Sequence, residues 1–370
     1  MHSILDAEVY TSPKWFDAER VEIFRKLWIV AGFRSTVNSH DSFLTHNIGG
    51  VPIIVQNTKS GLRAFVNECA HRQAQLHLAD FGQRRLSCPY HGWVYDDEGR
   101  VRAIPGNEAN FGMSPSDLKG LGLTPVSLLV VGGLIFVNLA RHPIPITEQF
   151  HQAYIDRLEE LSSVVGEDVM FGKFGTGYNW KLNFENVVDL FHIPFVHAQS
   201  FARAIPSLKP APPGAMSMVA PAVPDAEISD DIRELSYENR LGYEFRDWPW
   251  HECVERCGPT QEYLNLYIYP NVNYTLMGGV VHAIQQFCPI APDRTEFRLS
   301  MALGKRRKRI PAASAILWTY FKAEKAAIDE DTAVLEGLQR CAQSSARTAF
   351  HGAYEYRLRR IAKVYRRLVA

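Results

Sequence analysis

The chain has 370 residues, of which 46 % are hydrophobic and 22 % are charged. This is the composition of a globular protein, and the length is enough for about two ordinary domains. Forty basic residues balance forty acidic ones, which argues against a dedicated binder of nucleic acid or of a membrane surface.

The longest apolar run, VSLLVVGGLIFVNLA at residues 126–140, is too short to span a bilayer, for which about 20 residues are needed. Its two central glycines favour a pair of strands instead. The N-terminus lacks the charged-then-apolar order of a signal peptide. We therefore expect a cytoplasmic protein whose six cysteines are reduced thiols.

The first elements in chain order are a helix and a small β domain. Residues 13–30 are predicted to form a helix, because Pro13 stands near its start and Phe16, Phe24 and Leu27 recur at helical spacing. Short β-rich runs then alternate with turn residues between about residues 40 and 140, which indicates strands.

The second half of the chain mixes helices and strands. Helices are predicted at residues 145–165 and from about Asn183. Residues 204–231 contain six prolines and are predicted to form a long loop or lid. Three strand-rich runs follow, and the last long element is a helix at about 311–340. The strand-rich runs are EYLNLYIYPNVNYTLM, VVHAIQQFCPI and TEFRLSMAL.

Two short motifs in the β domain each pair a cysteine with a histidine. Cys69 and His71 are followed, after sixteen residues, by Cys88 and His91. Zinc accepts two sulfurs and two nitrogens, but the usual zinc order groups two cysteines together and two histidines together. One Cys and one His from each loop suit a two-iron cluster with thiolates on one iron and imidazoles on the other, the Rieske arrangement. We expect the remaining His77 to lie on the domain surface.

A second group of metal-binding side chains lies in NFENVVDLFHIPFVH. Glu185, Asp189 and His192 are spaced i, i+4, i+7 and are predicted to share one helix face. Pro194 is expected to end that helix, so that His197 comes from the following turn. Two neutral imidazoles suit a first-row metal, although one core histidine and one surface histidine would explain the pattern equally well.

A facial triad also needs a carboxylate, and the helix at 311–340 offers several. Asp331 falls within the apolar stripe of that helix, whereas Asp329 and Glu330 are predicted to point away. A buried carboxylate is costly unless it is paired or bound to a metal. Glu324 also lies near the stripe, so helical spacing alone does not single out Asp331. The stripe consists of Leu317, Phe321, Ile328, Leu335 and Leu338.

The sequence resembles the large (α) subunit of Rieske-type non-heme iron oxygenases over nearly its whole length. CPYHGWVYDDEGR is close to the second cysteine loop of that family, while Gln73 stands where the family usually has glycine after C-x-H-R. The resemblance implies an α+β fold with three parts. These are an N-terminal helical segment packing on the catalytic domain (1–39), an all-β Rieske domain (40–143), and a helix-grip catalytic domain with an antiparallel sheet and a long C-terminal helix (144–370).

The resemblance also implies roles for individual residues. It places a [2Fe–2S] cluster on the four Cys and His ligands and one Fe²⁺ on His192, His197 and Asp331, since the family's distal aspartate stands five residues before a Glu, here Glu336. Asp189 matches an acid that links an iron-ligating histidine, here His192, to a Rieske histidine, here His91, of a neighbouring subunit. Asn186 matches a residue near the iron, and Phe191 stands where many members have Tyr.

The expected function is that of a terminal oxygenase. It would use dioxygen and electrons from a separate reductase or ferredoxin to hydroxylate a small aromatic substrate, with or without a carboxylate. Oxidative demethylation or hydroxylation of a methylated amine is the alternative, and a Rieske electron carrier is the rival class. The family implies a head-to-tail homotrimer or a multiple of it, with a small β subunit in some members. Candidate substrate contacts are Phe201, Tyr267, Tyr269 and Phe287.

Overall fold

The computed structural model describes residues 5–197, 199–200, 223–241, 245–260, 262–344, 350–352 and 355–369. The chain divides into two compact units, Phe24–Ile144 and a larger unit made of Met1–Ile23 with Pro145–Ala370. Among the described residues, no helix combines the length and apolar character that a membrane span requires.

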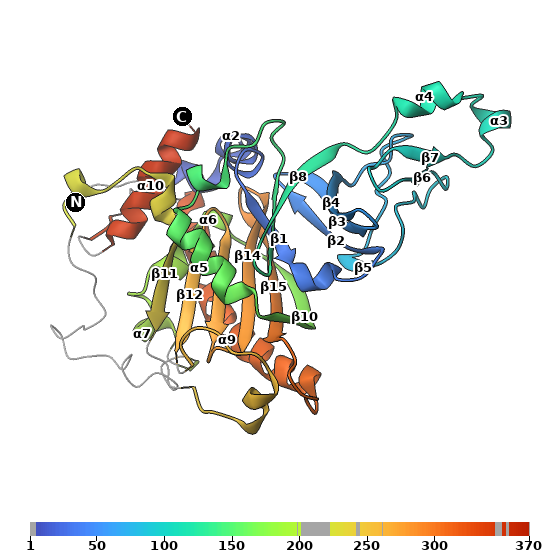
Figure 1. The fold of residues 1–370 in the computed structure, drawn as a ribbon. Helices are drawn as coiled ribbons and strands as arrows, with labels where there is room; N and C mark the ends of the chain where they lie inside the picture. The colour runs from blue at the N-terminus through green and yellow to red at the C-terminus, as the bar shows by residue number, and fades with distance from the viewer. Residues whose placement is uncertain are drawn as a thin grey trace. The chain divides into compact units, whose positions relative to one another are not determined.

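The smaller unit is built on an antiparallel seven-stranded sheet with the order β1-β9-β8-β4-β3-β2-β5 (Figure 1). Two further strands pair with each other, and two short helices follow them. The strands of the large sheet are β1 (Ile29–Phe33), β2 (Ser42–Ile48), β3 (Val51–Thr58), β4 (Gly61–Val66), β5 (Phe81–Gln83), β8 (Pro125–Val131) and β9 (Leu134–Asn138). The smaller elements are β6 (Val94–Tyr95), β7 (Val101–Ala103), α3 (Asn107–Asn110) and α4 (Pro115–Lys119).

The apolar run at 126–140 forms the hairpin β8–β9, which confirms the prediction of paired strands. The predicted helix at 13–30 is too long. Helix α2 covers Pro13–Glu19 and continues as a π-helical turn to Phe24, but Ile29 already begins β1. All five residues of β1 are buried, and a short run that is apolar throughout fits a buried strand as well as a helix.

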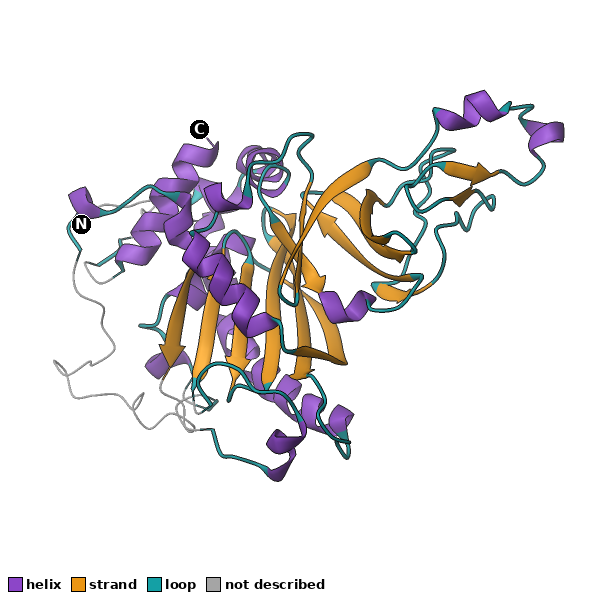
Figure 2. Ribbon diagram, viewed as in Figure 1, coloured by secondary structure: helices purple, strands orange, loops and turns teal. Residues whose placement is uncertain are grey.

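The larger unit contains an antiparallel sheet, whose strands are among those drawn in orange in Figure 2. This sheet has six strands in the order β10-β15-β14-β13-β12-β11. Its strands are β10 (Val165–Thr176), β11 (Tyr237–Leu241), β12 (Tyr263–Ile268), β13 (Val272–Met277), β14 (Val281–Ala291) and β15 (Arg294–Gly304). Its helices are α1 (Glu8–Thr11), α2, α5 (Gln152–Ser162), α6 (Trp180–Val188), α7 (Ile193–Val196), α9 (Ala313–Ser344) and α10 (Tyr356–Val369). The α+β class and the three predicted strand runs are confirmed.

Two helices of the larger unit pack on its sheet and thereby position the site. Helix α9 contacts β10 and β15, and α6 contacts β13 and β14. The apolar stripe of α9 is buried at Leu317, Ile328 and Leu335, whereas Leu338 is exposed. Of the predicted loop at 204–231, residues 204–222 lie outside the described part of the chain. The remainder includes a 3₁₀ turn at Asp225–Glu227.

Candidate metal centres and the adjoining pocket

The two cysteine loops of the smaller unit have the same backbone hydrogen bonds. In the first loop the Cys69 N–H donates to the Ala74 carbonyl (2.8 Å), and the Gln73 N–H donates to the Cys69 carbonyl (2.9 Å). In the second loop Cys88 donates to Trp93 (2.8 Å) and Gly92 donates to Cys88 (3.1 Å). In each loop, therefore, the residues four and five positions after the cysteine are hydrogen-bonded to the cysteine backbone. The two ligand loops have equivalent backbones.

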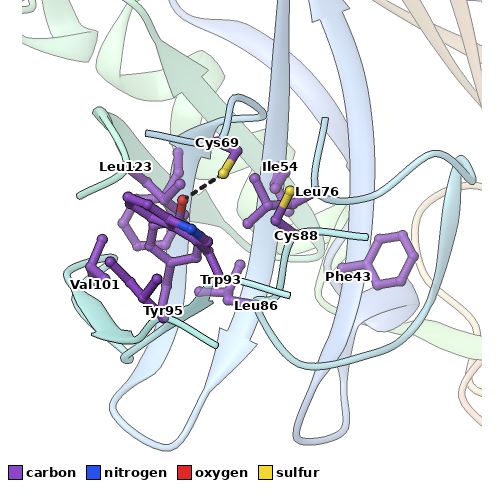
Figure 3. Packing of buried hydrophobic residues seen from close by; sticks show 12 residues of the cluster. Phe43, Ile54, Cys69, Leu76, Leu86, Cys88, Trp93, Tyr95, Val101 and Leu123 are labelled. Atoms are coloured by element: carbon purple, nitrogen blue, oxygen red, sulfur yellow. Dashed lines mark hydrogen bonds between the residues drawn. The ribbon is translucent and has the colours of Figure 1, made fainter. Parts of the chain in front are cut away.

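Both sulfurs lie inside the hydrophobic core of this unit (Figure 3). The Cys69 and Cys88 side chains are 1 % and 2 % exposed. The Tyr95 hydroxyl lies 3.0 Å from Cys69 Sγ and also accepts the Ala70 N–H at 3.0 Å. Because its oxygen already accepts a hydrogen bond, the hydroxyl hydrogen is free to be donated to a thiolate. Hydrogen bonds to ligating sulfurs are one of the means by which a protein tunes a cluster's reduction potential.

The two histidines of these loops lie nearer to solvent than the cysteines. His71 is half-buried and His91 is exposed. Their ring centroids are 4.7 Å apart, and His71 stacks on Trp93 at 5.1 Å. His77, by contrast, is buried: it stacks on Phe43 at 3.9 Å, and its Nε2 lies 2.9 Å from Gln56 Oε1. The prediction that it lies on the surface was wrong, because the ring packs on an aromatic neighbour in the core and its Nε2 meets one amide oxygen.

The four Cys and His side chains do not gather tightly enough for a single ion. Ligand bonds to zinc are about 2.0–2.3 Å long, so donor atoms around one ion lie within about 4.6 Å of one another. Among the described residues, a group of three or more such donors that all lie within 4.8 Å of one another occurs only at His192, His197 and Asp331. The wider set fits a two-iron cluster, with the sulfurs buried and the imidazoles toward the surface.

Gln73 and Gly92 occupy equivalent positions in the two loops, and both have left-handed backbones, with φ of 61° and 71°. A residue with a side chain loses about 1–2 kcal/mol of stability in this conformation. Replacing it with glycine removes that cost, but part of the gain is lost because glycine has more conformational entropy in the unfolded chain. We expect Gln73→Gly to raise the free energy of unfolding by about 0.5 kcal/mol, measured by urea unfolding of the cluster-loaded protein.

The matched control for Gln73 is Gly92→Ala. An added Cβ at Gly92 would lie 3.0 Å from Pro105 Cγ, so this variant should lose about 1–2 kcal/mol of stability. A destabilising Gln73→Gly would contradict the assignment of backbone strain to Gln73.

The second candidate centre forms where α6 ends. Helix α6 stops at Val188, Asp189 has an extended backbone, and His192 precedes the short helix α7. The predicted continuous helix face is therefore wrong, and Glu185 instead accepts a hydrogen bond from Tyr10 (2.8 Å). Pro194 lies within the first two residues of α7 rather than ending a helix. A proline there costs nothing because its missing N–H would have no helical partner.

Three donors converge at this point from two separate segments. Asp331 Oδ1 on α9 lies 3.1 Å from His197 Nε2 and 3.6 Å from His192 Nε2. The side chains of His197, His192 and Asp331 are 3 %, 15 % and 16 % exposed. Two imidazoles and one carboxylate are the facial triad that binds non-heme iron and leaves other coordination positions open. The geometry thus fits a mononuclear iron.

Glu330, which we predicted to point away from the site, holds one of the imidazoles. Its Oε2 lies 2.8 Å from His197 Nδ1 and accepts the Ser200 hydroxyl at 2.5 Å. A carboxylate there keeps the proton on Nδ1, which leaves the Nε2 lone pair for the metal. Spacing on α9 could not show this, because Glu330 lies outside the apolar stripe and yet contacts the same imidazole as Asp331.

Glu330→Gln is expected to weaken iron binding by about 10–100-fold, the usual effect of losing an outer partner of a metal ligand. Iron dissociation constants, measured by competition with a chelator, check this prediction. Asp329→Asn removes an exposed charge on the same helix and should leave the constant unchanged. Equal iron affinity in the wild type and Glu330→Gln would show that His197 needs no such partner.

Asp189 lies beside the triad but is not part of it. Its Oδ2 is 3.5 Å from His192 Nδ1, and its Oδ1 accepts the Phe191 N–H at 2.8 Å. The first distance is longer than a good hydrogen bond. Phe191 is 48 % exposed, and Phe195, whose ring centroid lies 6.0 Å from that of Phe191, is 65 % exposed.

A small cavity of about 60 Å³ adjoins the three donors. Tyr267 and Asn186 line it, as expected of substrate and iron neighbours, whereas Tyr269 packs on Phe184 and Phe287 packs on Phe297. Phe201 lies outside the described residues. The lining also contains residues that the sequence analysis did not select: Leu190, Leu241, Tyr263, Asn265, Asn273, Gln285, Ala327 and Ile328. Alternation of Tyr263, Asn265 and Tyr267 along β12 is the signal that could have revealed part of this face.

The comparisons with known proteins agree with this geometry. Residues 147–370 match the model of the ring hydroxylating alpha subunit (catalytic domain), and residues 27–122 match the Rieske [2Fe-2S] domain. The chain belongs to the ring-hydroxylating α-subunit family, which confirms the resemblance seen in the sequence. The two domains imply a [2Fe–2S] cluster and a mononuclear iron.

Several characterised relatives are similar to the chain. The glycine betaine monooxygenase oxygenase subunit of Pseudomonas aeruginosa (strain UCBPP-PA14) is 31 % identical over 51 % of this chain and 44 % of its own length. The anthranilate 1,2-dioxygenase large subunit of Acinetobacter baylyi (strain ATCC 33305 / BD413 / ADP1) is 32 % identical over 51 % and 41 %. The matches thus span less than half of these relatives. The fold also matches a solved quaternary ammonium Rieske monooxygenase, at 17 % identity and a TM-score of 0.74 over 98 % of this chain and 94 % of that one.

Proposed function

We propose that the chain is the terminal component of an oxygenase that hydroxylates a small organic molecule. The observation that carries this proposal is the presence of two unlike donor sets, Cys₂His₂ in one unit and His₂Asp beside a cavity in the other. When bound, the two groups supply stored single electrons and an iron able to react with dioxygen. A pure electron carrier would need only the first set.

The residues at and around the His₂Asp donor set have separate roles. His192, His197 and Asp331 hold the metal, and Glu330 keeps the proton of His197 on Nδ1. Asn186 borders the cavity next to His192. Asp189, fixed by the Phe191 N–H, is placed to orient His192 through Nδ1 and to receive His91 of a neighbouring copy of the chain.

The electron donor is proposed to be a separate reductase or ferredoxin, and the assembly a homotrimer or a multiple of it. Exposed Phe191, which Asp189 holds by its N–H, and exposed Phe195 close to Phe191 suit a contact between copies, because exposed aromatic groups clustered at one place mark interaction sites. A β subunit is carried over from the resemblance, and a cytoplasmic location is part of the same proposal.

The substrate is proposed to be a small organic molecule that enters the cavity beside the triad. An aromatic acid would need a cationic partner for its carboxylate, and no lysine or arginine occurs among the described residues that line the cavity. An aromatic substrate without a carboxylate, as in the breakdown of aromatic compounds, is one candidate. Oxidation of a methylated amine is the other, and Glu324, the acidic residue of the lining that is not in the triad, favours it.

The test compares the wild type with His192→Ala, both loaded with iron and cluster and supplied with a ferredoxin–reductase pair. The wild type should consume dioxygen when a substrate from a mixed panel of arenes and methylamines is added. His192→Ala should keep the Rieske absorption and lose that consumption. A variant that retained full function would identify an electron carrier, and release of formaldehyde would identify demethylation.

A further inference from the structure

The cavity beside the triad holds a second carboxylate, on Glu324. This residue lies on α9 seven residues before Asp331, and both line the cavity. Seven residues are two turns, about 10 Å along the helix axis, so the two carboxylates lie on one helix face at opposite ends of the cavity floor. Ala327 and Ile328, both buried, line the stretch between them. The floor is thus anionic at one end, apolar in the middle and metal-binding at the other end.

Glu324 is only 4 % exposed, yet the partners that hold it are neutral. The Tyr263 hydroxyl donates to Oε1 at 3.0 Å and lies 3.2 Å from Oε2, and Gln285 Nε2 donates to Oε2 at 2.9 Å. A buried charge is costly unless an opposite charge or several hydrogen bonds compensate it. Consistent with this, burial raises the pKa of Glu324 to about 7.

The hydrogen bonds of Glu324 fix the orientation of the neighbouring amides. Because an ionised carboxylate only accepts, Gln285 must present its NH₂ group to it and turn Oε1 toward Asn273. Asn273 Nδ2 then donates to Gln285 Oε1 (3.3 Å) and to Asn265 Oδ1 (3.0 Å). This leaves Asn273 Oδ1, in a side chain that is 3 % exposed, as a buried acceptor without a partner. Besides the Glu324 carboxylate, the cavity lining thus contains a second hydrogen-bond acceptor, Asn273 Oδ1, to which a bound molecule could donate.

Resting on the proposed function, we infer that Glu324 binds the positive charge of the substrate, and that the substrate is a small organic cation. Its charged nitrogen lies against Glu324, and its apolar part lies along Ala327 and Ile328. The carbon to be oxidised then points toward the triad. The tyrosine rings of the lining add cation–π attraction to the same nitrogen. Glu324 is in this account a specificity-determining residue and not a metal ligand.

The test uses two cations, each paired with a neutral molecule of similar size and shape. Choline is compared with dimethylbutanol, in which a tert-butyl group replaces the trimethylammonium, and benzylammonium is compared with benzyl alcohol. Benzoate represents anionic ring substrates. Calorimetric binding constants are measured with iron- and cluster-loaded wild type, with Glu324→Gln, which keeps the size of the side chain, and with Asp329→Asn, which removes an exposed charge from the same helix.

The wild type should bind at least one cation about tenfold or more tightly than its neutral partner. That ratio should fall to near one in Glu324→Gln and persist in Asp329→Asn. Which pair shows the preference separates alkyl from arylalkyl ammonium substrates. No preference for either cation, tightest binding of benzoate, or an unchanged ratio in Glu324→Gln would overturn the inference.

If Glu324→Gln fails to fold, the wild-type ratios alone decide. Failure of the proposed function is recognised separately. It would appear as a wild type that binds no iron at the triad or shows no Rieske absorption, whatever probe it binds.

Discussion

Replacing Asp331 with alanine is expected to abolish binding of the mononuclear iron and to lower turnover by more than about a hundredfold. This loss exceeds the effect of about 10–100-fold that is usual for removing a residue that only hydrogen-bonds to a metal ligand. The physical reason is the position of Oδ1, which lies near both Nε2 atoms, at 3.1 Å and 3.6 Å. Alanine leaves two imidazoles, and two neutral ligands cannot complete a facial triad. Iron content after gel filtration and substrate-dependent uptake of dioxygen check the expectation.

The neighbouring acids on α9 provide graded controls for Asp331. Asp329, with 59 % of its side chain exposed beside Lys325, should tolerate alanine with full iron content. Glu330→Gln should weaken iron binding without abolishing it, and Glu324→Gln should leave iron content intact. The Rieske absorption should be the same in all variants, because its ligands lie in the other unit. Full iron occupancy in Asp331→Ala would remove this residue from the triad.

How much the sequence can predict depends on how local the determinants are. Cys69 and His71 lie in one loop and Cys88 and His91 in another, so each half of that set can be found from spacing alone. The equivalence of the two loops extends to the left-handed position, where Gln73 replaces a glycine. Its strain becomes visible only when φ is known.

The second centre was less predictable because it combines segments far apart in the chain. His192 and His197 were found as a pair, but the end of α6 at Val188 was missed. The apolar residues Leu190 and Phe191 follow it, so the apolar pattern of the helix continues past its end. Choosing Asp331 over Glu324 required the resemblance, because both fall near one helix face. The structure shows that both face the cavity, one toward the imidazoles and the other toward Tyr263 and Gln285.

A buried ion pair was invisible in the sequence because the pair and its hydrogen-bond partners come from three helices. Glu19 on α2 accepts hydrogen bonds from Lys181 (2.5 Å) and Trp180 (2.6 Å) on α6, and from Tyr365 (2.6 Å) on α10. Glu19 is 0 % and Lys181 is 2 % exposed. The Lys181 ammonium also lies 5.2–5.4 Å from the ring centroids of Tyr10, Trp180 and Tyr365. The cluster thus joins both ends of the chain to the helix that leads to His192.

Glu19→Gln is expected to lower the free energy of unfolding by about 3–5 kcal/mol, because it leaves the Lys181 charge buried without a counter-ion. Urea or thermal unfolding of the metal-loaded protein measures the loss. Lys181→Met should be similarly damaging, since it leaves the Glu19 carboxylate unpaired. The double variant should recover most of the loss, because removing both charges also removes the uncompensated one. Additive losses in the double variant would show that the two charges contribute independently and that the pair does not act as a unit.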